Sequence, residues 1–163
     1  IVRQYAIGPH SRANVWVDLE APELASTDVS ATITSSQPIV VERAMYLNSQ
    51  GRLFGAGHVS AGVTSPAPEW FLAEGATGDY LDLFVLVANP SEANAEVTAT
   101  YLLPDGTTIA RHHTVAGRSR YTIWVDQEDP RLADTSVSTT ITTAPSTSHP
   151  YSCPTSYSTR RGE

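Results

Sequence analysis

The chain has no lysine, and all ten of its basic residues are arginines. A catalytic Schiff base and a phosphate-binding P-loop both need a lysine amine, so neither chemistry is available. The lysine–asparagine cross-link found in some surface adhesins is excluded for the same reason. The net charge of −7 leaves no clustered basic surface for a phosphate backbone, and we expect no nucleic-acid partner.

Cysteine and long apolar runs are also scarce. Cys153 is the single cysteine, so no disulfide can form within the chain, and its polar surroundings predict a free or intermolecular thiol. No segment reaches the roughly 18–20 consecutive apolar residues of a membrane span, and we expect no membrane insertion. The chain begins at Ile1, inside a predicted strand and without a signal peptide, so we expect a fragment of a longer protein.

What the chain does have favours short strands. Valine, threonine and other residues that suit a pleated, half-buried surface are abundant, and 11 prolines and 10 glycines interrupt them at short intervals. Apolar and polar residues alternate in several segments, and no window has sustained helical periodicity. The expected strands are 81–87, 97–103, 109–115, 121–125 and 137–141, preceded by 15–17, 29–33 and 39–46. Tight turns are expected at Pro104–Gly106 and Asn48–Gly51.

An internal repeat organises the sequence. The segment RANVWVDLEAPELASTDVSATIT, which starts at Arg12, returns without a gap as RYTIWVDQEDPRLADTSVSTTIT, which starts at Arg120. Roughly half of the positions aligned between Arg3 and Thr34 are identical. The offset that aligns Arg12 with Arg120 fits an immunoglobulin-type sandwich, which has about 100 residues. We therefore predict an all-β chain of antiparallel, immunoglobulin-like β-sandwich repeats, about one and a half copies long.

Five sequence motifs carry a resemblance to a known class of repeat. They are WFLAEGATG, LDLFVLVANP, TYLLPDG, the WVD-x-E-x-P loop and VERAMY. Together they are similar to a tandem immunoglobulin-like or fibronectin-like repeat of large secreted bacterial proteins, over about residues 1–143. The resemblance implies an extracellular or cell-surface location and a structural or adhesive role, and it carries over no catalytic residue.

The repeat predicts how the chain is divided. Residues 1–55 should be the C-terminal half of one sandwich, 56–68 a linker between repeats and 69–145 a second sandwich. Residues 146–163 form a Ser/Thr/Pro-rich tail where the pattern calls for a last strand, so the second sandwich should lack a regular one. We hypothesise that the segment 39–46 supplies this strand, in the same chain or in another copy, through Ile39, Val41, Arg43 and Met45.

Two tryptophans are candidates for ligand binding. Trp16 and Trp124 lie between aliphatic residues, and strand alternation places each on the face opposite its neighbours. We expect them to be buried, as the tryptophan of an immunoglobulin core is. The alternative is an exposed platform, with Tyr121, that binds surface glycans.

Acidic residues of the repeated loops are candidates for a calcium site. They are Asp18, Glu20, Asp126, Glu128 and Asp129. Calcium takes six to eight oxygen ligands, often several from one loop. The alternative is a turn in which aspartate caps backbone donors and the glutamates are solvated, and that is the alternative we favour, with no cofactor.

Other pairs and motifs are weaker candidates. Glu42 and Arg43 should point to opposite faces of a strand and pair with cross-strand partners. His112 and His113 should also face opposite ways, so both cannot bind one metal ion. Ser60 lies in GAGHVSAG, but the glycine that a nucleophile elbow needs two residues earlier is His58.

These observations favour a non-enzymatic function. We expect a structural or adhesive module whose partners are neighbouring repeats or other copies of the chain. A carbohydrate-binding module is the alternative, and exposure of Trp16 and Trp124 distinguishes the two.

Overall fold

The computed structural model describes residues 1–49, 52–144 and 153–159 of the chain. These residues divide into two compact units, Ile1–Ile33 and Thr34–Glu163, and each is described by itself. The regular structure consists of antiparallel strands and short 3-10 helices, which confirms the all-β class. Within the described ranges, no helix is long and apolar enough to cross a membrane.

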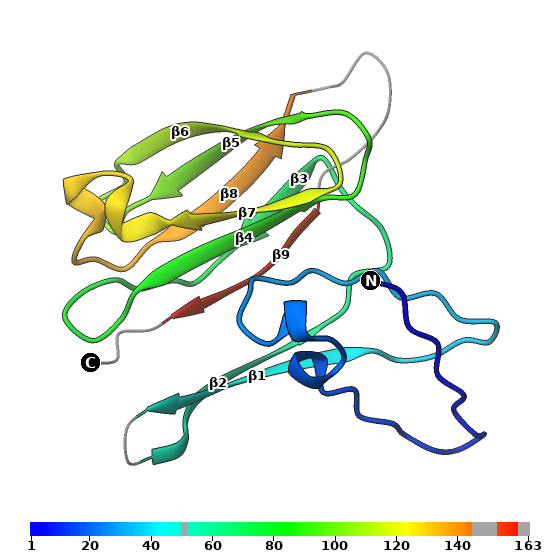
Figure 1. The fold of residues 1–163 in the computed structure, drawn as a ribbon. Helices are drawn as coiled ribbons and strands as arrows, with labels where there is room; N and C mark the ends of the chain where they lie inside the picture. Colours follow the sequence, from blue (N-terminus) through cyan, green and yellow to red (C-terminus); the bar gives the residue numbers. More distant parts are fainter. Residues whose placement is uncertain (50–51, 145–152, 160–163) are drawn as a thin grey trace. The chain divides into compact units, whose positions relative to one another are not determined.

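The larger unit contains a β-sandwich of two antiparallel sheets (Figure 1). In the first sheet the strands lie in the order β3 (Glu69–Leu72), β8 (Ser138–Thr143), β5 (Ala95–Leu102) and β6 (Thr108–Val115). In the second the order is β7 (Ser119–Trp124), β4 (Leu83–Asn89) and β9 (Cys153–Thr159). The five strands predicted between residues 81 and 141 are thus confirmed, with small shifts at their ends.

Strand alternation builds the core between the two sheets. Along β4, residues Leu83, Val85 and Val87 are buried while Phe84 and Leu86 on the opposite face are only half-buried. The buried apolar cluster is Leu83, Val85, Val87, Val97, Ala99, Tyr101, Ile109, Val115, Ile123, Val125, Leu132, Val137 and Ile141. Strands β4, β5, β6, β7 and β8 therefore each contribute one face to the core, as half-buried strands should.

The two halves of the sandwich sequence are interleaved. Strand β6 pairs with β5, β7 pairs with β4, and β8 lies between β3 and β5. In the described sheets β6, β7 and β8 have no ladder with one another. In the described chain, the strands of the second half of the repeat therefore take all their ladder partners from the first half.

Asn89 closes one end of the sandwich. Its side chain is 1% exposed, and Nδ2 donates to the carbonyls of Ala93, Val115 and Ala116 at 2.8, 3.0 and 3.2 Å. Its Oδ1 accepts from the amide and the hydroxyl of Ser91. These contacts join the connection from β4 to β5 with the connection from β6 to β7, both of which cross between the sheets.

The tail differs from the prediction. Residues Cys153–Thr159 form β9 and pair with β4, so the position of the last strand is occupied. Proline is tolerated there because β9 is an edge strand, and the register shifts between Val85 and Val87, next to the pair Val87–Pro154. Residues 145–152 and 160–163 lie outside the described part.

A hairpin precedes the sandwich in the same unit. Strand β1 (Glu42–Ser49) pairs with β2 (Arg52–Ala61), from Glu42 opposite Ala61 to Ser49 opposite Arg52. This confirms the chain reversal predicted at 48–51, of which 50–51 lie outside the described part. The predicted linker was wrong in part, because its first residues belong to β2.

The smaller unit has no strand. Residues 1–41, all of which the structure describes, contain two 3-10 helices, η1 (Val17–Leu19) and η2 (Pro22–Leu24), so the strands predicted at 15–17 and 29–33 are wrong. A strand needs a partner, and in the second copy the partners are β3, β4 and β5. The printed chain contains no first-copy counterpart of those strands, because the offset of the repeat places that counterpart ahead of Ile1.

Candidate functional site

The repeated WVD-x-E-x-P loop forms two short 3-10 helices after β7. These are η3 (Val125–Gln127) and η4 (Pro130–Leu132), and each anchors one apolar side chain in the core: Val125 and Leu132 are 0% exposed. Proline at the first position of η4 has a backbone angle that suits a helical turn. Asp129 caps the same helix, because its Oδ1 accepts from the amide of Arg131 at 3.0 Å.

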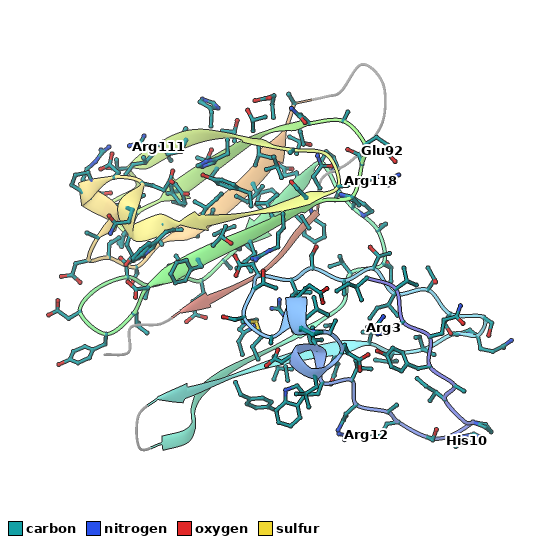
Figure 2. All side chains as sticks on the ribbon, viewed as in Figure 1. Arg3, His10, Arg12, Glu92, Arg111 and Arg118 are labelled. Carbon is teal, nitrogen blue, oxygen red and sulfur yellow. The ribbon has the colours of Figure 1, made fainter. Side chains whose placement is uncertain are left out.

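An arginine on β6 holds this loop against the sheet. Arg111 lies beside η3 and η4 (Figure 2), where its Nε donates to the carbonyl of Glu128 at 2.9 Å and its guanidinium pairs with Asp129 at 2.7 Å. Arg131 also contacts Asp129. Hydrogen bonds from the guanidinium and the backbone amide of Arg131, and then one from the guanidinium of Arg111, hold the pKa of the Asp129 carboxyl well below its usual range. We call Arg111, His113, Tyr121, Glu128 and Asp129 the loop cluster.

The rest of the loop cluster is aromatic and acidic. His113 Nε2 lies 3.4 Å from Glu128 Oε2, and its ring lies 5.3 Å from the ring of Tyr121. The side chains of His113 and Glu128 are 10% and 18% exposed. Tyr101 lies below them in the core, where burial, and then the charge of Glu128, raise the pKa of its phenol. His113, Glu128 and Asp129 are thus largely closed to solvent, whereas Arg111 and Tyr121 are partly exposed.

The first copy repeats these contacts. Arg3, the counterpart of Arg111, donates to the carbonyl of Glu20 at 2.6 Å and lies 3.6 Å from its carboxylate. Tyr5, the counterpart of His113, donates to Glu20, and this hydrogen bond raises the pKa of its phenol. One arginine therefore holds the carbonyl of the loop glutamate in both copies.

The backbones of the two copies also match. Trp16 has φ −93° and ψ 95°, and Trp124 has φ −92° and ψ 98°. His10 and Arg118 occupy equivalent positions of the two copies, and they are the two residues other than glycine with positive φ in the described chain, at 54° and 51°. The repeat thus encodes its loop conformation locally, even where the strands around it do not form.

The predicted calcium ligands are not brought together. Asp126 is buried, and its Oδ2 accepts from the amide of Leu83 at 2.9 Å. Asp129 binds two arginines and Glu128 contacts His113, whereas Glu20 is held by Arg3. Among the described residues, no group of three His, Cys, Asp or Glu side chains could hold a metal ion. These contacts match the alternative of a capped turn, except that Glu128 and Glu20 have protein partners.

The tryptophans are exposed, so the expectation of burial was wrong. Trp16 is 67% exposed and Trp124 is 43% exposed, while Ile123 and Val125 on either side of Trp124 are buried. Trp124 lies on the outer face of the second sheet, where its ring packs 5.4 Å from that of Phe84 at an angle of 40°. Tyr121 is 42% exposed on the opposite face of β7, so it does not share a surface with Trp124.

Two of the residues proposed for strand exchange lie in the hairpin of β1 and β2 and not beside β4. Arg43 and Met45 lie on β1, opposite Ser60 and His58 of β2, and the amide of Gly62 donates to the carbonyl of Val41. Burial lowers the pKa of His58, and Arg43 lowers it further. Ile39 precedes β1 and is 46% exposed. Donation of this strand to β4 within the chain is contradicted, because β9 already pairs with β4.

His112 and His113 face opposite sides of β6, as predicted. His113 shares the core face with Val97, whereas His112 contacts the hydroxyl of Thr98 at 3.0 Å on the outer face. Ser60 lies within β2. Cys153 begins β9, opposite Ala88 of β4.

A shallow depression lies at the end of the sandwich away from Asn89. It has a volume of about 620 Å³ and is lined by small and apolar residues of 73–76, 102–104 and 136–138, with Leu81 and Glu74. Gly75 permits the close packing beside it, because a Cβ there would lie 2.6 Å from Leu83 Cδ2 and 3.2 Å from the carbonyl of Val137. Two of the motifs that mark the repeat, WFLAEGATG and TYLLPDG, meet here.

Comparison with known proteins gives only weak structural similarity. No family model matches the chain, and no curated protein matches it. Among solved structures, the Anabaena sensory rhodopsin transducer is similar over 60% of this chain and 92% of its own, with 16% sequence identity and a TM-score of 0.48. We transfer nothing about function from that likeness.

Sequence reasoning named four members of the loop cluster separately, but it missed Arg111, which joins them, and the role of Asn89. A signal for the first was present, because Arg3 and Arg111 are identical between the copies while their neighbours at the next two positions differ. For Asn89 there was no local signature, because two of the three carbonyls that its side chain binds lie 26 and 27 residues away.

Proposed function

We propose that the chain is a non-catalytic structural repeat of an extracellular protein, which serves as a spacer or assembly module. The observation that carries this proposal is the use of the polar side chains shared by the two copies. Arg3 and Arg111 both hold the carbonyl of a loop glutamate, and the buried Asp126 binds the backbone of Leu83. These charged side chains are thus bound to the backbone of the repeat and stabilise its fold.

A lengthened chain tests the spacer role. A second copy of residues 35–142 inserted after Thr142 keeps the register of the repeat, because Thr34 and Thr142 are equivalent. Each inserted repeat should increase the maximum dimension measured by small-angle X-ray scattering by at least about 26 Å, the length of an eight-residue strand such as β5. An unchanged maximum dimension would count against a spacer.

Carbohydrate binding is a second candidate because Trp16 and Trp124 are both exposed, as that alternative requires, although Tyr121 lies on the opposite face of β7 from Trp124. The ring of Trp124 and that of Phe84 form a small aromatic surface on the outer face of β4 and β7. Stacking on a sugar should retard the protein during electrophoresis in gels that contain a polysaccharide, and Trp124→Ala should abolish that retardation. Trp70→Phe is the matched control, because Trp70 packs against the core and donates to the carbonyl of Ala67. Equal mobility with and without each polysaccharide tested would reject this candidate.

A further inference from the structure

The unit Ile1–Ile33 exposes an unusual amount of apolar side chain. Its exposed residues include Ile1, Ile7, Val15, Val17 and Ile33, at 68%, 49%, 44%, 38% and 57%. A soluble domain does not normally leave so many aliphatic side chains of one short segment in water.

In the second copy, the equivalent side chains are buried. They are Ile109, Val115, Ile123, Val125 and Ile141, and these are 3%, 1%, 1%, 0% and 1% exposed. Every one of the five belongs to the buried cluster of the sandwich. The exposed residues of the first copy therefore stand at positions that form the core in the second copy.

The other side of the core is visible in the second copy. There, the covering side chains come from β4 and β5, with Val85 at 1%, Val97 at 2% and Tyr101 at 0% exposure. The backbone partners come from the same half, since β6, β7 and β8 pair with β3, β4 and β5. Both the apolar cover and the ladder hydrogen bonds thus come from residues 69–108.

One polar contact also joins the second half of the repeat to its first half. Asp126 accepts a hydrogen bond from the amide of Leu83, which lies in the first half of the repeat. Its counterpart Asp18 is identical in type and exposed. The first copy thus keeps a carboxylate whose partner in the second copy is a backbone amide of the first half.

We infer that residues 1–33 are a docking surface for the first half of another sandwich repeat, a segment of the type Glu69–Thr108. A second copy of residues 1–33 would not reproduce the pairing seen in the second repeat, because β6, β7 and β8 do not pair with one another in the described sheets. The chain's own β3, β4 and β5 are already paired with its own second half. The inference rests on the repeat organisation proposed above, and it identifies the partner that each repeat takes.

The local conformation of residues 1–33 is already suited to this partner. The 3-10 helices, the arginine contact and the positive φ of His10 match those of the second copy. Docking therefore requires the flanking segments to extend into strands, while the loop keeps its backbone. This arrangement corresponds to strand addition, in which ladder hydrogen bonds supply affinity and alternate side chains supply specificity.

A fused chain tests the inference. A copy of residues 69–108 is placed directly before Ile1, so that Thr108 is followed by Ile1 where Ile109 stands in the second copy. Amide exchange of residues 15–17 and 29–33, measured by mass spectrometry, should slow by at least about a hundredfold and approach that of residues 123–125 and 137–141. Exchange as fast as in the unfused chain would overturn the inference.

The matched control carries Val85→Asp and Val97→Asp in the added copy alone. These changes place charges where the core requires apolar side chains, so the control should leave residues 1–33 unprotected while the original sandwich remains intact. Equal protection with the control and the unaltered fusion would overturn the inference. So would protection of residues 1–33 in the unfused chain at a concentration where sedimentation shows a dimer, because the partner would then be a second copy of the chain. The scattering test of the spacer role does not depend on either result.

Discussion

The Asn89 contacts make a sharp prediction about stability. Asn89→Asp keeps the shape and the acceptor for Ser91 but replaces the donor by an oxygen that faces the carbonyls of Ala93, Val115 and Ala116. A lost buried hydrogen bond and the groups that it leaves unpaired cost about 1–3 kcal/mol each, so we expect a loss of about 4 kcal/mol at pH 7. Asn89→Ala should cost about 3 kcal/mol, because the carbonyls lose their donor without meeting a charge.

The pH dependence of Asn89→Asp follows from the same contacts. Three facing carbonyls disfavour the carboxylate, so the pKa of this Asp in the folded state should rise above the unfolded value of about 3.9. A group with a raised folded pKa stabilises the folded state increasingly as the pH falls towards the unfolded value. The Asp variant should therefore regain about 1.4 kcal/mol relative to the Ala variant for each unit by which the pKa is raised, between pH 7 and pH 4.

Urea denaturation followed by circular dichroism at pH 7, 5.5 and 4 measures these differences. Asn94→Asp is the matched control, because Asn94 is exposed in the same loop and its oxygen accepts from the amide of Gly117. That acceptor is kept, so the control should change stability by less than about 0.5 kcal/mol. A cost below about 1 kcal/mol for Asn89→Asp at pH 7, or a difference from Asn89→Ala that is independent of pH, would refute the reasoning.

Three further predictions concern the loop cluster and the packing beside the depression. Arg111→Ala should lower the free energy of unfolding by about 1–2 kcal/mol, whereas Arg131→Ala, at a more exposed position, should cost clearly less in the same urea titration. Gly75→Ala should cost about 1–3 kcal/mol by thermal denaturation, since its Cβ would overlap Leu83, and Gly8→Ala, with Ser11 Oγ at 3.6 Å, should be neutral. The pKa of Asp129 is lowered in the folded state, so its contribution to stability is present above the unfolded value and is lost as the pH falls towards the folded value. Asp129→Asn should therefore flatten the acid limb of the stability curve, and an unaltered limb would contradict the assignment.

Much of the sandwich could be predicted from alternation alone. Strands β4 to β8 lie close to the segments where apolar and polar residues alternate, and Gly106 has the positive φ, at 84°, that suits the predicted turn. The errors arose where strand formation depends on a partner. Residues 15–17 alternate as 123–125 do, but alternation yields a strand only beside β4, which the first copy lacks.

The candidate site was harder to predict for a related reason. Alternation placed Trp124 opposite Ile123 correctly, but which face of a strand is the core depends on the packing of the other sheet. The partners of Arg111 lie 17 and 18 residues away, in a loop that folds back over β6. Such contacts depend on the sandwich being assembled, and a sequence pattern does not specify them.

The interleaved strand order also constrains when the molecule can fold. During synthesis β3, β4 and β5 emerge before the other strands of the sandwich, and they gain most of their ladder partners only when residues up to Thr143 have been made. Contacts so distant in sequence form slowly, and the waiting strands keep their apolar faces open. In a polypeptide with successive copies, an unpaired first half could contact the second half of a neighbouring copy, because the copies have the same pattern of apolar residues. Correct pairing then requires each second half to be synthesised before the second half of a neighbouring copy pairs with the same strands.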